Sequence, residues 1–275
     1  PRFAELYARS CFSFLTGASH PEELLEQAAS LGYSALAITD ECSLAGVVRA
    51  YAAWRRTPDA PKLIIGSSIR LEDGPTLVLL ATDRAAYGQL SSLVTRGRRA
   101  AEKGHYRLTR LDLARGLPGC LALLVPPDLI DPDPQPLAAD ACWLAERFPD
   151  ACWLAAPLHL GPDDAARRRG IKAAAESAGI PVAATCAALM HDASRRRLAD
   201  VLTALRHRVT LDDAGYLLAA NGEQRLQPRD ILARRHPPEW IAQTLAIAER
   251  CNFSLAELRY EYPQEIVPPT ATPAS

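Results

Sequence analysis

The chain has 275 residues, of which 48% are hydrophobic and 23% are charged, and these fractions exclude a wholly disordered protein. Its formal net charge of -1 is not the strongly basic balance of a nucleic-acid-binding domain. No apolar run reaches the roughly 18 residues that a transmembrane helix needs, and the first residues lack the charged and apolar regions of a secretory signal.

The seven cysteines predict a cytoplasmic protein with reduced thiols. Their number is odd and no C-x-x-C pair occurs, so we expect free cysteines that mostly fill the core. The chain begins at Pro1 and closes on the proline-rich run PQEIVPPTATPAS, which is typical of a linker. We therefore expect it to be part of a longer protein.

Short apolar runs alternate with helical patterns along the chain. Strands are expected in FAELYAR from Phe3, SALAITD from Ser34, KLIIGSSIRL from Lys62, TLVLLATD from Thr76, CLALLVPP from Cys120, ACWLAAPL from Ala151 and PVAATCAA from Pro181. Helices are expected after most of these runs. In PEELLEQAASLG, for example, Pro21 suits the first turn and Gly32 suits the end. The Asp73-Gly74 pair between the third and fourth strands predicts a hairpin.

The expected strands are continuous apolar runs, as is typical of strands that are covered on both faces. Two architectures fit this pattern, a closed β/α barrel and an open doubly wound sheet. No G-x-G-x-x-G follows the first strand, which weakens the dinucleotide-binding form and favours a distorted (β/α)7 barrel. We assign residues 1–209 to the barrel and residues 210–275 to a helical extension, in which PEWIAQTLAIAERC is the longest expected helix.

In a β/α barrel the chemistry lies at the carboxyl ends of the strands. The side chains expected at that edge are Tyr7, Arg9, Asp40, Glu41, Ser67, Ser68, His159, Ala187, Leu189 and His191. A dinuclear or trinuclear hydrolase needs several histidine and carboxylate ligands there, with open positions for water. These residues do not make a complete ligand set.

Three stretches together carry a family resemblance. They are SFLTGASHPEELLEQAASLGYSALAITDECSLAGVVRAY from Ser13, RLEDGPTLVLLATDRAAYGQLSSLVTRGRRAAEKG from Arg70, and ERCNFSLAELRYEYPQEIVP from Glu249. They resemble the N-terminal polymerase-and-histidinol-phosphatase (PHP) domain of bacterial C-family DNA polymerases, in particular the error-prone, damage-inducible α subunit (ImuC type). The resemblance spans nearly the whole chain and implies a distorted seven-stranded β/α barrel.

The resemblance also implies the place of a metal pocket. In metal-bearing members the first strand supplies His-x-His, the second Asp-His, the third a Glu and the last Asp-x-His. The corresponding positions here are, in order, Tyr7 and Arg9, Asp40 and Glu41, Ser68, and Ala187 and Leu189. Only Asp40 matches its family residue, so the resemblance implies a vestigial pocket without catalytic or metal-binding residues.

We expect Arg9 to take the place of the missing cations. Its guanidinium would form an ion-pair network with Asp40 and Glu41, because buried carboxylates must be paired to be tolerated. The run Arg195, Arg196 and Arg197 follows the last strand, and we expect it to contact other polymerase domains or DNA. The other arginine clusters, with His20, His105 and His236, are interpreted as surface residues.

These observations predict the N-terminal PHP domain of an error-prone translesion DNA polymerase, with a scaffolding role and no cofactor of its own. Mg²⁺ is expected only in the palm of the parent nucleotidyltransferase, toward which residues 210–275 would lead. The resemblance implies three partners besides the other polymerase domains, namely a Y-family-like accessory protein, a RecA-like accessory protein and the sliding clamp. DNA would be reached through the full-length protein, and no membrane is involved. The alternatives are a metal-dependent phosphoesterase or 3′–5′ exonuclease with a remodelled pocket, and a protein-docking platform.

Overall fold

Seven strands form one sheet in the order of the sequence, and the expected strands are all present. The structure is a computed structural model that describes residues 1–127 and 135–258. The strands are β1 (Ala4–Ala8), β2 (Ala35–Ile38), β3 (Lys62–Arg70), β4 (Thr76–Ala81), β5 (Cys120–Val125), β6 (Cys152–Pro157) and β7 (Val182–Thr185). Neighbouring strands are parallel except at β3–β4 and β4–β5, which are antiparallel. The predicted hairpin at Asp73-Gly74 joins β3 to β4, with Arg70 opposite Thr76.

The sheet is nearly closed into a barrel, because the chain after β7 returns to the end of β1. Ala8 and Ala188 form a parallel bridge, in which the Arg9 amide donates to the Ala188 carbonyl at 2.9 Å. The Ala188 amide donates in turn to the Tyr7 carbonyl at 2.9 Å. The expected distorted seven-stranded barrel is therefore confirmed, and its first and last strands end side by side.

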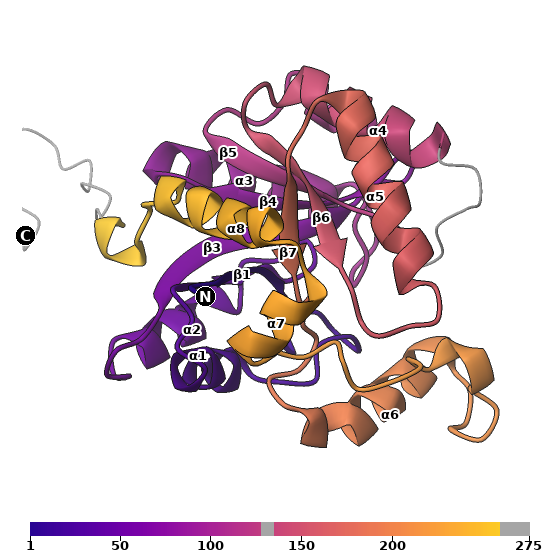
Figure 1. The fold of residues 1–275 in the computed structure, drawn as a ribbon. Helices are drawn as coiled ribbons and strands as arrows, with labels where there is room; N and C mark the ends of the chain where they lie inside the picture. The colour runs from indigo at the N-terminus through magenta and orange to yellow at the C-terminus, as the bar shows by residue number, and fades with distance from the viewer. Residues whose placement is uncertain (128–134, 259–275) are drawn as a thin grey trace, which may run out of the picture.

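Five helices cover the outside of the sheet, as Figure 1 shows, namely α1 (Pro21–Ser30), α2 (Val47–Trp54), α3 (Arg84–Arg99), α4 (Gln135–Arg147) and α5 (Asp164–Ala178). After β7 follow α6 (Arg196–His207), α7 (Arg229–Arg235) and α8 (Pro238–Arg250). The start of α1 follows from the sequence. Pro21 fills the first turn, and the His20 amide at the N-cap donates to Glu23 Oε2 at 2.8 Å. Among the described residues, no helix is long and apolar enough to cross a membrane.

Helix α8 belongs to the barrel itself. Its residues Ile247, Ala248 and Cys251 join a buried cluster with inward-facing residues of the strands, such as Leu80 and Ala155. Side chains of α8 also bind the amino-terminal ends of the strands. Gln243 Oε1 accepts from Trp153 Nε1 at 2.9 Å, and Thr244 Oγ1 accepts from the Ala4 amide at 3.2 Å. The expected boundary at residues 209 and 210 therefore does not separate two packing units, because the apolar face of α8 fills space inside the barrel.

The outer layer between sheet and helices is a second buried cluster. It contains Leu36, Ile65 and Leu154 from the strands together with helix residues such as Leu24 and Leu90. Because both faces of each strand are buried, the strands have the continuous apolar sequences from which the barrel was predicted. All seven cysteines are free, and five of them are buried, as expected for core thiols.

Candidate functional site

The strand ends bring the predicted pocket residues to one edge of the barrel. The Thr39 amide donates to the Ala8 carbonyl at 2.9 Å, joining the end of β1 to that of β2. The Ser68 amide donates to the Asp40 carbonyl at 3.2 Å, joining β2 to β3, and Ala188 closes the edge against β1. Hydrogen bonds thus link the segments that carry Tyr7, Arg9, Asp40, Glu41, Ser68, Ala187 and Leu189.

The Asp40 carboxylate is buried and bonded to the turn that follows β1. Its Oδ1 accepts from the Ser10 amide at 2.7 Å and from Ser13 Oγ at 2.8 Å, while its Oδ2 accepts from Ser10 Oγ at 2.7 Å. Asp40 is only 1% exposed, and burial raises its pKa above the ordinary value although the serine hydrogen bonds act in the opposite direction. These three donors occupy the carboxylate from within the chain.

Arg9 does not form the predicted ion-pair network, and that prediction was wrong. Among the described residues Arg9 makes no ion pair, and its buried Nε has no hydrogen-bond partner. Its guanidinium carbon lies 5.0 Å from the centroid of the Tyr7 ring. The physical reason is local, because Ser10 and Ser13 on the turn after β1 already supply the donors from which Asp40 accepts. The charge of Arg9 still lowers the pKa of Asp40, but less than burial raises it.

Glu41 is bound by residues that the sequence did not single out. Tyr106 Oη donates to Glu41 Oε1 at 2.9 Å, and the Glu41 amide donates to Ser13 Oγ at 2.9 Å. Arg98 reaches the same turn, donating to the Glu41 carbonyl at 3.1 Å and to the Cys42 carbonyl at 3.0 Å. Glu41 is therefore fixed by a phenol and by backbone contacts, and burial raises the pKa of that phenol above its usual value. No local pattern links Tyr106 or Arg98 to Glu41 along the chain.

The remaining pocket positions offer little to a cation. Ser68 is 1% exposed, and among the described residues its Oγ has no hydrogen-bond partner. Ala187 is buried with a φ of 46°, where the chain turns away from β7, and Leu189 is half-buried. Neither side chain carries a ligand atom.

A second buried carboxylate, Glu5, was missed by the sequence analysis. It is 0% exposed on β1 and accepts from the Tyr7 amide at 2.9 Å, from the Cys186 amide at 2.7 Å and from Thr185 Oγ1. Burial raises the pKa of Glu5, and these hydrogen bonds only partly offset the shift. The available signal was a single glutamate inside the apolar run FAELYA. Glu5 ties β1 to the end of β7 and so helps to close the barrel.

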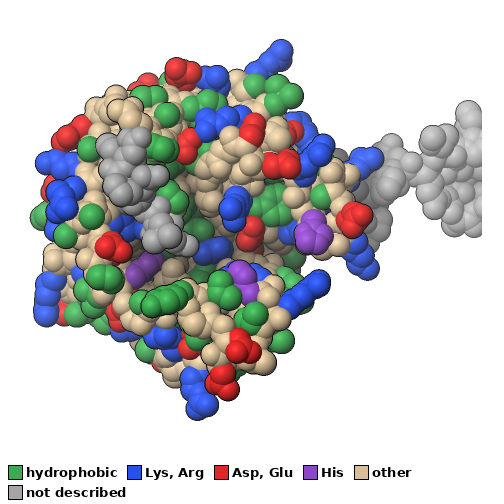
Figure 2. Space-filling model, turned by 90° about the vertical axis from the view of Figure 1, so that its right-hand side faces the viewer, with side chains coloured by type: hydrophobic (Ala, Val, Ile, Leu, Met, Phe, Trp, Pro, Cys, Tyr) green, Lys and Arg blue, Asp and Glu red, His purple; other side chains and the backbone are tan. Residues whose placement is uncertain are grey.

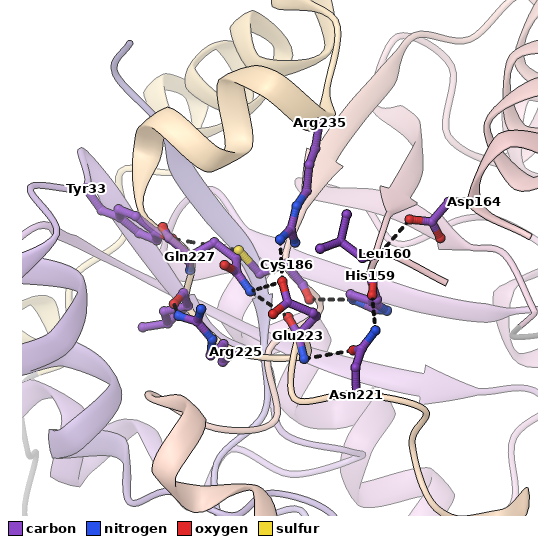
Figure 3. Close-up of polar contacts among 11 residues, drawn as sticks. Tyr33, His159, Leu160, Asp164, Cys186, Asn221, Glu223, Arg225, Gln227 and Arg235 are labelled. Carbon is purple, nitrogen blue, oxygen red and sulfur yellow. Dashed lines mark hydrogen bonds and ion pairs between the residues drawn. The ribbon is translucent and has the colours of Figure 1, made fainter. Parts of the chain in front are cut away.

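The two histidines expected at the carboxyl ends of the strands contact other segments of the chain. His159 Nε2 lies 2.8 Å from the Cys186 carbonyl, and Asn221 Nδ2 donates to the His159 carbonyl at 2.6 Å (Figure 3). His191 Nδ1 lies 2.8 Å from Ser19 Oγ and 3.9 Å from Glu23 Oε2. Both rings thus hold segments together at the rim of the barrel.

The segment 221–227, which precedes α7, binds residues that follow α1 and β6. Glu223 accepts from Gln227 Nε2 at 3.1 Å and pairs with Arg235, while the Gln227 carbonyl accepts from Tyr33 Oη at 2.6 Å (Figure 3). The neighbouring His236 was expected at the surface, but it is 2% exposed. It packs near Trp240, and burial lowers the pKa of His236 to about 4. The surface prediction failed because α7 and α8 bury the turn between them.

Comparisons with known proteins show which proteins this chain is similar to. Residues 5–136 match the family of PHP domains. These residues belong to the PHP family. The chain is 60% identical over 273 residues to the error-prone DNA polymerase of Aromatoleum aromaticum, a match that covers 99% of this chain and 26% of that protein. It is 51% identical over 280 residues to the error-prone DNA polymerase of Dechloromonas aromatica, covering 100% of this chain and 26% of that protein.

The PHP chain thus spans about a quarter of the length of these curated relatives. By this similarity it is the PHP domain of an error-prone DNA polymerase. Among solved structures it is similar to an amidohydrolase from Chromobacterium violaceum, with 15% identity, coverage of 66% of this chain and 86% of that chain, and a TM-score of 0.48.

The described residues of this PHP domain do not fit the metals that its family implies. Within residues 1–127 and 135–258, no group of three or more His, Cys, Asp or Glu side chains could hold a metal ion. The retained Asp40 is bonded to Ser10 and Ser13, and the positions around it offer Arg9, Ser68 and aliphatic side chains. Lys, Arg and His side chains are prominent around the hollow in the middle of the face drawn in Figure 2.

Of the arginines predicted to contact other domains or DNA, two are used inside the chain. Arg195 pairs with Glu23 on α1, and Arg196 pairs with Asp200 at 3.3 Å and donates to the Ala219 carbonyl at 2.6 Å. Arg197 is exposed. The paired side chains of Arg195 and Arg196 remain partly exposed, and the predicted contact of all three with another domain or DNA stays a prediction.

Proposed function

We propose that this PHP domain is a structural scaffold of an error-prone DNA polymerase and that its pocket is vestigial. The observation that carries the proposal is the state of Asp40, the one pocket residue that retains its family identity. Three internal donors occupy its carboxylate, and it is almost fully buried. A metal ligand needs a free lone pair directed at the ion, and releasing Asp40 would leave the Ser10 amide without an acceptor.

The longer relatives support further proposals about the parent protein. We place its nucleotidyl transfer in a palm outside this chain, with Mg²⁺ held there, and its work in synthesis across DNA lesions in the cytoplasm. The proposed partners are a Y-family-like accessory protein, a RecA-like accessory protein and the sliding clamp. DNA would be engaged by the full-length protein.

The test is the metal content of the purified chain after passage over a chelating resin. Zinc, manganese and iron would be measured by elemental mass spectrometry for the native chain and for Asp40→Asn, which keeps the size of the side chain. We expect both proteins to contain far less than one metal per chain, and neither to hydrolyse a phosphodiester or a DNA 3′ end.

A different result would favour the metal-dependent phosphoesterase or 3′–5′ exonuclease. If the native chain carries nearly one metal per chain, loses it in Asp40→Asn and hydrolyses phosphodiesters in a chelator-sensitive manner, the scaffold proposal is wrong. A thermal melt of Asp40→Asn beside the native chain separates a general loss of folding from the loss of a ligand.

A further inference from the structure

Helix α6 leaves several apolar side chains exposed to solvent, although Leu202 and Ala204 face inward. Leu198, Val201 and Leu205 are 40%, 38% and 57% exposed, and their spacing of three and four residues places them along one stripe. Of the twelve residues of α6, only Ala204 is buried. We call the three residues Leu198, Val201 and Leu205 the α6 stripe.

The polar side of α6 makes the internal contacts. Arg196 and Asp200 form an ion pair at 3.3 Å, and Arg196 also donates to the Ala219 carbonyl at 2.6 Å. The ion pair lies within the helix, whereas the bond to Ala219 joins α6 to the segment that follows it. Figure 1 shows α6 at the lower edge of the molecule, away from the layer of helices around the sheet. The α6 stripe is therefore not covered by the other helices.

Exposed apolar side chains continue in the segment after α6. Leu211 and Leu217 are each 46% exposed, and Tyr216 is fully exposed. Single exposed leucines need no explanation, but an apolar stripe with further apolar residues nearby is typical of an interaction surface. Arg197, Arg206 and Arg208 on and just after the same helix are exposed as well. A partner that covers the stripe should therefore be apolar at its centre and acidic at its rim.

We propose that the α6 stripe is the docking surface for the part of the polymerase polypeptide that lies outside this chain. The proposal rests on the proposed function. The rest of the polypeptide is chosen as the binding partner because the relatives are much longer than this chain. The chain accounts for about a quarter of the relatives that it matches, so about three quarters of such a polypeptide is tethered to the domain and present at equal stoichiometry. Tethering gives that portion an effective concentration that a separate protein lacks. A surface that binds DNA phosphates has Lys and Arg at its centre, whereas the centre of this surface consists of leucine and valine.

Site-specific photo-crosslinking in the full-length polymerase tests the occupant. A benzophenone amino acid would replace Val201, and in a control protein it would replace Leu111, which is 81% exposed on the turn Arg110–Leu113. We expect intramolecular crosslinks from position 201 to residues beyond this chain, and none from position 111. Crosslinks between two polymerase copies, to DNA or to lipid vesicles, or no crosslink from position 201, would overturn the proposal.

A variant pair gives an independent readout. The triple variant L198D, V201D and L205D should lower the melting temperature of the isolated chain only modestly, because these side chains are already 38–57% exposed. In the full-length protein the same variant should increase proteolytic cleavage between this domain and the rest at least about tenfold, while L111D should not. Equal cleavage of variant and native polymerase would refute the docking surface. Neither the crosslinking nor the proteolysis involves the pocket. The metal measurement can therefore contradict the scaffold proposal without contradicting the docking surface, and these two experiments can contradict the docking surface without affecting the metal result.

Discussion

Removal of the Asp40 carboxylate tests whether this residue is structural. Asp40→Ala leaves the buried Ser10 amide without an acceptor and deprives the Ser10 and Ser13 hydroxyls of theirs. An orphaned buried donor costs about 1–3 kcal/mol, and a hydroxyl that can rotate toward another acceptor costs about 1 kcal/mol. We therefore expect Asp40→Ala to lower the free energy of unfolding by about 4 kcal/mol. That is a large part of the roughly 5–15 kcal/mol of a typical domain.

Asp40→Asn should be much milder, because the structure lets an amide replace most of the bonds. The amide oxygen can keep the two donors at Oδ1, and the amide nitrogen can donate to Ser10 Oγ once that hydroxyl rotates. We expect a loss of about 1 kcal/mol. Urea denaturation of both variants and of the native chain, followed by circular dichroism, measures the difference.

The pH dependence of the unfolding free energy tests the direction in which burial shifts the pKa of Asp40. Because burial raises the pKa of Asp40 above its ordinary value of 3.8, its carboxyl contributes stability that is present below that pH and lost as pH rises through the folded pKa. The native chain should therefore lose stability relative to Asp40→Asn over that range. An Asp40→Ala variant that costs less than about 1 kcal/mol, or an Asn variant as damaging as Ala, would refute this account of the pocket.

Three further predictions concern buried groups. Glu5→Gln should flatten the pH dependence of the unfolding free energy above the ordinary Glu pKa of 4.5, because the raised pKa of Glu5 makes native stability fall there as pH rises. His236→Phe should reduce acid sensitivity between pH 6.5 and about 4, because the lowered pKa of His236 makes native stability fall as pH falls through that window. Gly46→Ala would place a Cβ 2.5 Å from Asp40 Oδ2 and should destabilise the chain by about 1–3 kcal/mol. Gly88→Ala, where a Cβ meets nothing within 4 Å, should be neutral or stabilise by about 0.5–1 kcal/mol.

Denaturation series at several pH values and thermal melts check these expectations. An unchanged pH slope in Glu5→Gln would mean that Glu5 is not a buried titrating group. The same slope in native chain and His236→Phe would contradict the assignment of acid sensitivity to His236. Equal melting temperatures for the two glycine variants would contradict the close packing of α2 against Asp40.

Much of the architecture was predictable because its signals are local. The run CLALLVPP becomes β5 because a buried strand needs only a short continuous apolar segment, and Pro21 with Glu23 starts α1 through contacts within one turn. The placement of Asp40 and Ser68 at one edge also followed, since the ends of parallel strands in a barrel meet. The family positions that this chain has replaced could be named from the sequence for the same reason.

The partners of those residues were decided only by the tertiary structure. Asp40 accepts hydrogen bonds from Ser10 and Ser13 and not from Arg9. Several donors lie close to this one carboxylate, and only the folded turn after β1 determines which of them bind it. His236 is buried because α7 and α8 pack over it.

The sequence by itself thus determined the elements, their order and the edge at which the pocket lies, since these depend on periodicity and on neighbours along the chain. The structure decided what each polar side chain binds and which apolar faces stay open. The apolar face of α8 fills the barrel, whereas the similar stripe of α6 faces water. Amphipathic patterns of this kind do not encode which surface covers them, and only the packing of distant segments does.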